Sequence, residues 1–219
     1  MPRQCSKTQH QSSLTPLIKR IGILAYGSLI EDAGKELEPL LREKISDVQT
    51  PFSVEFARSS STRDGAPTLV PVEEGGDRVQ ATMLVLDPGV EIQRAEDLLW
   101  RRETRNECSD QHYSATASPG PNTVVVERLQ SVANVETVLY TKIAANIKNR
   151  TPEYLADLAI CSARRGAGAK RSDGISYLIS VRRQKIQTPL MSDYEAAILQ
   201  KTKAQTLDEA YEKIRQANA

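Results

Sequence analysis

The chain has 219 residues, of which 39% are hydrophobic and 26% charged, a composition typical of one globular domain or at most two small ones. Its 29 basic and 28 acidic residues almost cancel, so the net charge gives no reason to expect an acidic polymer as a partner. No apolar stretch approaches the ~18 residues that span a bilayer, and the N-terminus lacks the apolar core of a secretory signal. We therefore expect a cytoplasmic protein that does not enter membranes.

Cysteine and histidine are scarce. The three cysteines, Cys5, Cys108 and Cys161, are odd in number and widely spaced, which argues against a disulfide framework and for a reducing compartment. Only His10 and His112 accompany them, so a zinc site would lack ligands. We expect neither a metal centre nor a cofactor built on these side chains.

The first half of the chain has the pattern of strands. Residues 1–19 are too polar to bury a core, so we expect a disordered tail there and a single domain over residues 20–219. Six segments are predicted as strands: 21–26, 52–58, 68–72, 79–86, 123–129 and 135–143. Loops rather than helices separate most of them, and only a short helix around Leu37 to Leu41 intervenes early. This order predicts an α+β fold with a curled mixed or antiparallel sheet, or a small barrel, and flanking helices.

Helical signals dominate from about residue 150. Thr151 before Pro152 is a preferred pair at a helix start, and Ser192 with Glu195 and Thr206 with Glu209 match capping boxes. Residues 175–181 are ambiguous between strand and helix, and we favour a helix capped by Asp173. Residues 163–171 are predicted as a loop.

An earlier helix over residues 91–105 carries the first candidate for chemistry. Ile92, Ala95 and Leu99 mark one face, and Glu103 continues it. A carboxylate on a buried stripe loses solvation, and near a helix C-terminus it meets the negative end of the dipole, so both effects would make it a better base. The alternative is that the helix has ended and Glu103 lies on the surface beside Arg102 and Arg105.

Two loops supply further candidates. Tyr26, Gly27, Ser28 and Leu29 leave a predicted buried strand, and backbone N–H groups there could converge on a carboxylate or an oxyanion, although a simple turn is the commoner meaning. Residues 58–67 join two strands, and Arg63 could hold a carboxylate with its fork of donors, although an exposed hairpin loop has the same composition.

Three segments together resemble a known family. Residues 23–30, ILAYGSLI, resemble the YGSL strand-loop signature of the γ-glutamylcyclotransferase superfamily and look closest to its ChaC-type, glutathione-degrading branch. Residues 56–67 are similar to that branch's F-x-x-x-S-x-x-x-x-G-x-P, and residues 99–103, LWRRE, to the family's L-x-x-R-E. The likeness covers about residues 20–145 in the family's order. Two departures, an insert at residues 108–120 and Arg63-Asp64 in place of a histidine-arginine pair, lie where a leaving group would be.

The resemblance implies a reaction, the cyclisation of a γ-glutamyl peptide or amine to 5-oxoproline. Glu103 would be the catalytic acid/base, and no cofactor or metal would be needed. Residues 26–29 would hold the substrate, Tyr26 or Tyr113 would line its pocket, and Arg63 would meet a leaving-group carboxylate. The alternatives are a non-catalytic protein that binds γ-glutamyl or amino-acid ligands, and, less favoured, nucleic-acid binding by basic residues between 164 and 185. The leaving group and the oligomeric state stay open.

Overall fold

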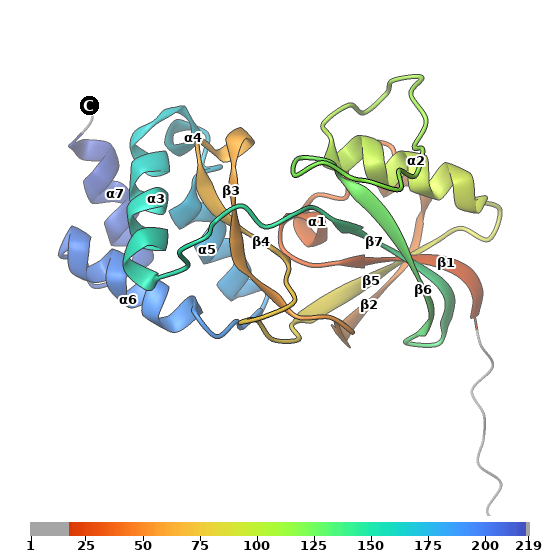
Figure 1. Cartoon of the computed structure of the whole chain (residues 1–219), viewed down its shortest axis with the longest axis horizontal. Coiled ribbons are helices and arrows are strands. Elements are labelled where there is room, and N and C mark those ends of the chain that lie inside the picture. The colour runs from red at the N-terminus through yellow and green to blue at the C-terminus, as the bar shows by residue number, and fades with distance from the viewer. Residues whose placement is uncertain (1–17, 218–219) are drawn as a thin grey trace, which may run out of the picture.

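The computed structural model describes residues 18–217 (Figure 1). The strands are β1 (Ile18–Ala25), β2 (Leu41–Gln49), β3 (Val54–Ser60), β4 (Ala66–Pro71), β5 (Gln80–Leu86), β6 (Val125–Val132) and β7 (Val135–Lys142). The helices are α1 (Ser28–Glu31), α2 (Ile92–Glu103), α3 (Pro152–Arg164), α4 (Gly166–Ala169), α5 (Gly174–Arg183), α6 (Met191–Thr202) and α7 (Leu207–Gln216), with 3₁₀ turns η1 (Glu38–Leu40) and η2 (Ser61–Arg63). Most of the predicted disordered tail lies outside the described residues, and Ile18 and Lys19 already belong to β1.

Five strands form a mixed sheet in the order β2-β5-β1-β7-β6. The central strand β1 runs antiparallel to β5, with Ile23 opposite Leu84, and parallel to β7, with Ile23 opposite Leu139. The hairpin of β3 and β4 is a separate two-stranded sheet. The prediction of an α+β fold with a mixed sheet is thus confirmed. The barrel alternative is wrong for the described part of the chain, because β2 and β6 remain open edges.

Three apolar cores hold these elements. One core lies between α2 and a face of the five-stranded sheet and includes Ile23, Leu84 and Leu99. A second core includes Leu24, Met83 and Val138. These residues are next to the first set along the same strands, so their side chains point to the opposite face of the sheet. The largest core joins the β3–β4 hairpin to helices α3, α5, α6 and α7. Figure 1 shows the hairpin between those helices and the five-stranded sheet.

Several local predictions fail for identifiable reasons. The helix expected around Leu37 to Leu41 is only the turn η1, and it leads into β2, a strand that the sequence pattern did not reveal. Most side chains of β2 are exposed because it is an edge strand, so the apolar alternation that predicts strands is missing. Helix α6 begins at Met191, so Ser192 is not its cap, and the predicted loop 163–171 contains α4.

Other caps form as expected. The side chain of Asp173 accepts hydrogen bonds from the N–H groups of Ile175 and Ser176, which makes residues 174–183 the helix α5. The Thr151 and Thr206 side chains cap α3 and α7 in the same way. The caps fix where α3, α5 and α7 begin.

A buried carboxylate fastens the hairpin to the helices. Glu55 on β3 is fully buried and accepts hydrogen bonds from Phe56 N at 2.7 Å, Thr188 Oγ1 at 2.6 Å and Leu190 N at 3.0 Å. Glu55→Ala would leave these three donors without an acceptor. We expect the free energy of unfolding to fall by about 2–4 kcal/mol. Denaturant unfolding measures this, with the exposed Glu136→Ala on β7 as the control. Equal stability of the two variants would contradict the anchoring role.

Candidate active site

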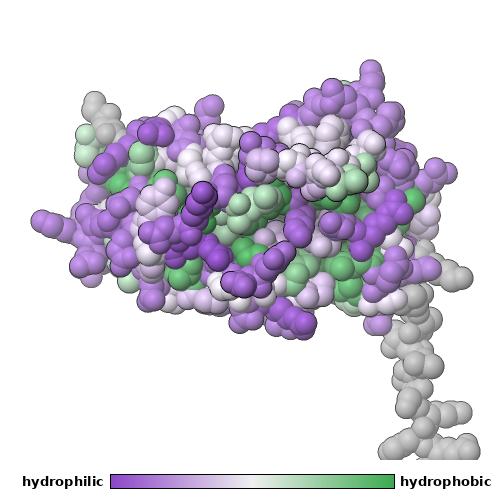
Figure 2. Space-filling view, viewed as in Figure 1, coloured by the Kyte–Doolittle hydropathy of each residue, from purple (hydrophilic) through white to green (hydrophobic). Residues whose placement is uncertain are grey.

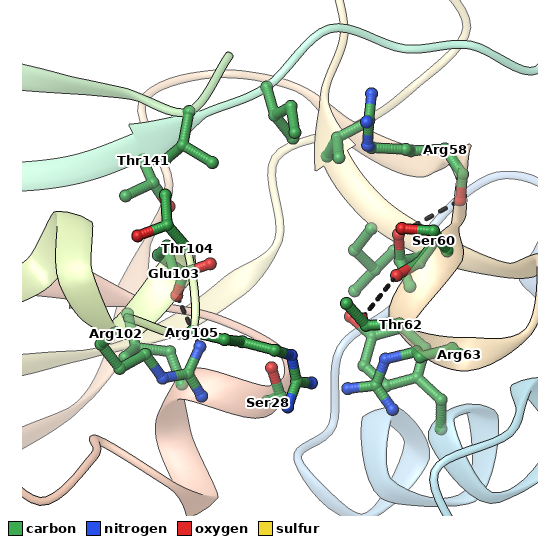
Figure 3. A pocket seen from close by; sticks show the side chains of 18 of the residues that line it. Ser28, Arg58, Ser60, Thr62, Arg63, Arg102, Glu103, Thr104, Arg105 and Thr141 are labelled. Atoms are coloured by element: carbon green, nitrogen blue, oxygen red, sulfur yellow. Dashed lines mark hydrogen bonds and ion pairs between the residues drawn. The ribbon is translucent and has the colours of Figure 1, made fainter. Parts of the chain in front are cut away.

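A cleft of about 780 Å³ lies between the five-stranded sheet with the end of α2 on one side and the β3–β4 hairpin with α5 on the other. Its lining comes from β1 and α1, from the β3–η2–β4 hairpin, from the end of α2, from β7 and from α5. Figure 2 shows a mostly hydrophilic face with hydrophobic residues grouped around its middle. Polar side chains extend into the cleft from both walls (Figure 3). Segments far apart in the sequence therefore contribute to one concave site.

The turn after β1 forms part of this cleft. Tyr26, Ser28 and Leu29 line it. Gly27 has φ +64° and ψ −135°, a conformation that side chains rarely allow, and a Cβ atom there would lie 2.5 Å from the Tyr177 hydroxyl. Ser28 and Leu29 begin α1, so their N–H groups have no acceptor inside the helix. The glycine thus lets the turn approach α5 closely and present two backbone donors.

Glu103 is the last residue of α2 and lines the same cleft. Ala95 and Leu99 are buried as the helical spacing predicts, whereas the Glu103 side chain is 24% exposed. Its carboxylate contacts Arg102 Nη1 at 2.5 Å, and Arg102 also donates to the Asp32 carbonyl oxygen at 2.5 Å. Glu103 is therefore neither fully buried on the apolar stripe nor free on the surface: it lines the cleft, half-buried, and is paired with Arg102.

Two tyrosine hydroxyls lie within electrostatic reach of Glu103. Burial, and after it the Glu103 carboxylate, raises the pKa of Tyr26 well above its ordinary value. Burial also raises the pKa of Tyr177, against the opposing effect of the Arg63 guanidinium. Both hydroxyls therefore stay protonated at neutral pH and can donate hydrogen bonds to an anionic group in the cleft.

Arg63 occupies the opposite wall. Its guanidinium stacks 4.4 Å from the centre of the Tyr177 ring and donates to the Ser172 carbonyl oxygen at 3.2 Å. The next residue, Asp64, has φ +51° and accepts a hydrogen bond of 2.6 Å from Ala167 N at the start of α4. The segment is therefore held against the helical part of the protein and is not a free hairpin loop. Arg58 also lines the cleft, but the oxygens of Pro121, Ala144 and Asn122 engage its guanidinium.

Tyr113 does not lie at this cleft. Its hydroxyl donates to Val126 O at 3.2 Å and accepts from Val126 N at 3.1 Å, and its backbone N–H donates to Asp97 at 2.7 Å. His112 contacts the same carboxylate at 2.7 Å. These bonds fasten the insert to α2 and β6, so the expected pocket-lining role of Tyr113 does not hold.

The structure adds residues that the sequence analysis did not assign to the site. Tyr177 comes from α5, and Arg102, Arg105, Glu107 and Asp32 complete the wall at the end of α2. Arg102 had a signal, because it is the arginine of the L-x-x-R-E motif, and Tyr177 lies in the alternating apolar segment 175–181. Neither pattern predicted the contact of Tyr177 with Gly27. Among residues 18–217 no three His, Cys, Asp or Glu side chains group as metal ligands would.

The basic residues between 164 and 185 are partly engaged within the protein. Arg171 contacts Glu212 at 2.9 Å and stacks on the Tyr211 ring, and Arg182 is paired with Glu195. These contacts account for part of the basic segment without a nucleic acid.

Comparisons with known proteins add no assignment, since no protein-family model and no curated protein matches the chain. No helix within the described residues is both long and apolar enough to cross a membrane.

Proposed function

We propose that the cleft binds a γ-glutamyl peptide or amine and converts it to 5-oxoproline and a free amine. One observation carries the proposal: Glu103 and the turn of residues 26–29 line one cleft although they are distant in the sequence. This is the juxtaposition that the resemblance to γ-glutamylcyclotransferases requires. Closing the lactam needs the substrate's α-amine placed against its own γ-carbonyl carbon, so the site has mainly to position and to move a proton.

The residues divide these tasks. The N–H groups of Ser28 and Leu29 bind the substrate's α-carboxylate, and Tyr26 and Tyr177 add hydroxyl donors. Glu103 takes a proton from the α-ammonium, the α-amine nitrogen bonds to the γ-carbon, and the bond from that carbon to the leaving nitrogen breaks. After the new bond forms, the ring nitrogen carries one hydrogen more than the lactam, and Glu103 passes this second proton as well as the first to the leaving nitrogen. The amine therefore departs as an ammonium ion, and atoms and charge balance without water or a cofactor.

The contact between Arg102 and Glu103 favours a second candidate, a protein that binds such ligands without turning them over. An arginine bonded to the carboxylate competes with the proton that Glu103 must accept. In this alternative the ligand occupies the same cleft and leaves unchanged.

Incubation of the purified protein with glutathione, γ-glutamyl dipeptides and γ-glutamyl amines distinguishes the two. We expect 5-oxoproline and the free amine in equal amounts from at least one compound. Saturable binding of these compounds, measured by calorimetry, with no 5-oxoproline would establish the binding protein instead. If the compounds neither bind nor react, both functions are wrong.

A further inference from the structure

The arginines of the cleft have unequal surroundings. Arg102 contacts Glu103, and Glu107 packs beside the Arg102 side chain against Gly34. By contrast, neither Arg63 nor Arg105 takes part in any ion pair among residues 18–217. Acidic side chains therefore gather on the Arg102 side of the cleft. Arg58 has no ion pair within this range either, but carbonyl and amide oxygens engage its guanidinium, so Arg63 and Arg105 are the cleft arginines with neither an ion pair nor such a set of acceptors.

Arg105 is held in position by the end of α2. Its N–H donates to Arg102 O at 3.2 Å and the next N–H, of Asn106, donates to Arg101 O at 2.8 Å, the two bonds of a Schellman motif. Arg105 thus has φ +56° at the position where glycine is usual, at a cost of about 1 kcal/mol. The strained residue directs its side chain into the cleft (Figure 3).

Arg63 faces Arg105 from the other wall. Figure 3 shows the two side chains extending toward each other from η2 and from the end of α2. After burial, the charges of Arg105 and Arg102 contribute to lowering the pKa of Arg63, as expected of guanidinium groups that share one cleft. Arg63 donates one hydrogen bond, to Ser172 O, and the guanidinium of Arg105 makes none within the described residues. Most of their ten N–H donors are thus available.

We infer that Arg63 and Arg105 form a clamp for a doubly negative group on the leaving amine of the substrate, such as an acidic amino acid or a phosphorylated amine. This inference rests on the proposed cyclisation. The γ-glutamyl part of the substrate has an ammonium and an α-carboxylate that cancel, so the negative charge must belong to the leaving group. One guanidinium fork matches one carboxylate, and two forks match a dicarboxylate or a phosphate dianion.

A matched substrate series tests the clamp. γ-Glutamyl-alaninamide, γ-glutamyl-alanine and γ-glutamyl-aspartate have leaving groups of charge 0, −1 and −2, and γ-glutamyl-O-phosphoethanolamine separates a phosphate from a dicarboxylate. We expect kcat/KM for 5-oxoproline release to rise about tenfold with each negative charge. Whichever doubly charged compound is the better substrate identifies the chemical source of the dianion.

Arg105→Gly is the informative variant, because glycine suits the left-handed backbone and the fold should be as stable or more stable. We expect the preference for charge −2 over charge −1 to fall to within about threefold, while the unfolding midpoint stays equal or rises. Arg183→Gln, an exposed change on α5, should keep the full charge dependence.

The outcomes separate the clamp from the reaction. Turnover that is independent of leaving-group charge, or a charge preference that survives in Arg105→Gly, would overturn the clamp and leave the cyclisation standing. If no compound releases 5-oxoproline, the proposed reaction fails and calorimetry of the same series decides about the clamp. Tighter binding of the dianionic compounds, lost in Arg105→Gly, would support it, and charge-independent or absent binding would overturn it.

Discussion

Glu103→Gln should lower 5-oxoproline release by about 10²- to 10⁴-fold, the usual range for loss of a general acid-base group. The amide keeps the size of the side chain and an oxygen that can accept from Arg102, so the ground-state structure of the cleft should change little. Because glutamine cannot take the proton of the substrate's ammonium, the loss should fall mainly on kcat, with substrate affinity nearly unchanged. Steady-state kinetics together with calorimetric binding measure the two quantities separately.

The matched control is Glu153→Gln, the same chemical change at an exposed position on α3. It should retain the rate of the unmodified protein. Full turnover by Glu103→Gln would remove Glu103 from the mechanism. Equal losses in both variants would trace the effect to protein stability, which a thermal unfolding curve would reveal.

Gly27→Ala should inactivate the protein by a different route. The backbone conformation at φ +64° resists a side chain, and the new Cβ would lie 2.5 Å from the Tyr177 hydroxyl. Together these effects should cost about 2–4 kcal/mol of stability. Relief of the contact must move the turn or α5, and a displacement near 1 Å of the N–H groups of Ser28 and Leu29 should lower kcat/KM by about 10²-fold.

Gly89→Ala provides the comparison, since nothing lies within 4 Å of its added Cβ and its φ is not in the left-handed region. A second comparison, Gly27→Ala combined with Tyr177→Phe, removes the hydroxyl that the Cβ would meet. Partial recovery of stability in the double variant would assign the loss to that contact. A Gly27→Ala protein as active as Gly89→Ala would place the anion-binding turn elsewhere.

Local patterns in the sequence were sufficient for the parts of the site that depend on nearest neighbours. The apolar run before Tyr26 predicts the strand that positions the turn. The spacing of Ala95, Leu99 and Glu103 predicts that the carboxylate lies on the same face of α2 as the two apolar residues. What these patterns could not supply is the pairing of segments across the fold. The contact of Tyr177 with the Gly27 turn depends on how the C-terminal helices pack on the β3–β4 hairpin.

Two of the differences have electrostatic causes. The Glu103 side chain was expected to lose solvation on an apolar stripe, but the structure gives it the neighbouring guanidinium of Arg102 as a partner. Tyr113 was expected to line the substrate pocket, but Asp97 on α2 accepts a hydrogen bond from the Tyr113 N–H and contacts His112, and these contacts hold that part of the insert away from the cleft. The spacing of hydrophobic residues predicts neither the pairing of Arg102 with Glu103 nor the hydrogen bond from the Tyr113 N–H to Asp97.

Two hydrogen bonds join residues 63 and 64 to the C-terminal part of the chain: Ala167 N–H donates to Asp64, and Arg63 donates to Ser172 O. They have a practical consequence for protein engineering. A shortened protein that stops before α3 would retain the strand-and-helix wall with Glu103, yet it would lack Tyr177 and the backbone groups that hold Arg63 and Asp64. Neither the part before α3 nor the C-terminal helices alone would then form the complete cleft. Any chimera that exchanges the C-terminal helices should change which ligands are accepted while leaving Glu103 in place.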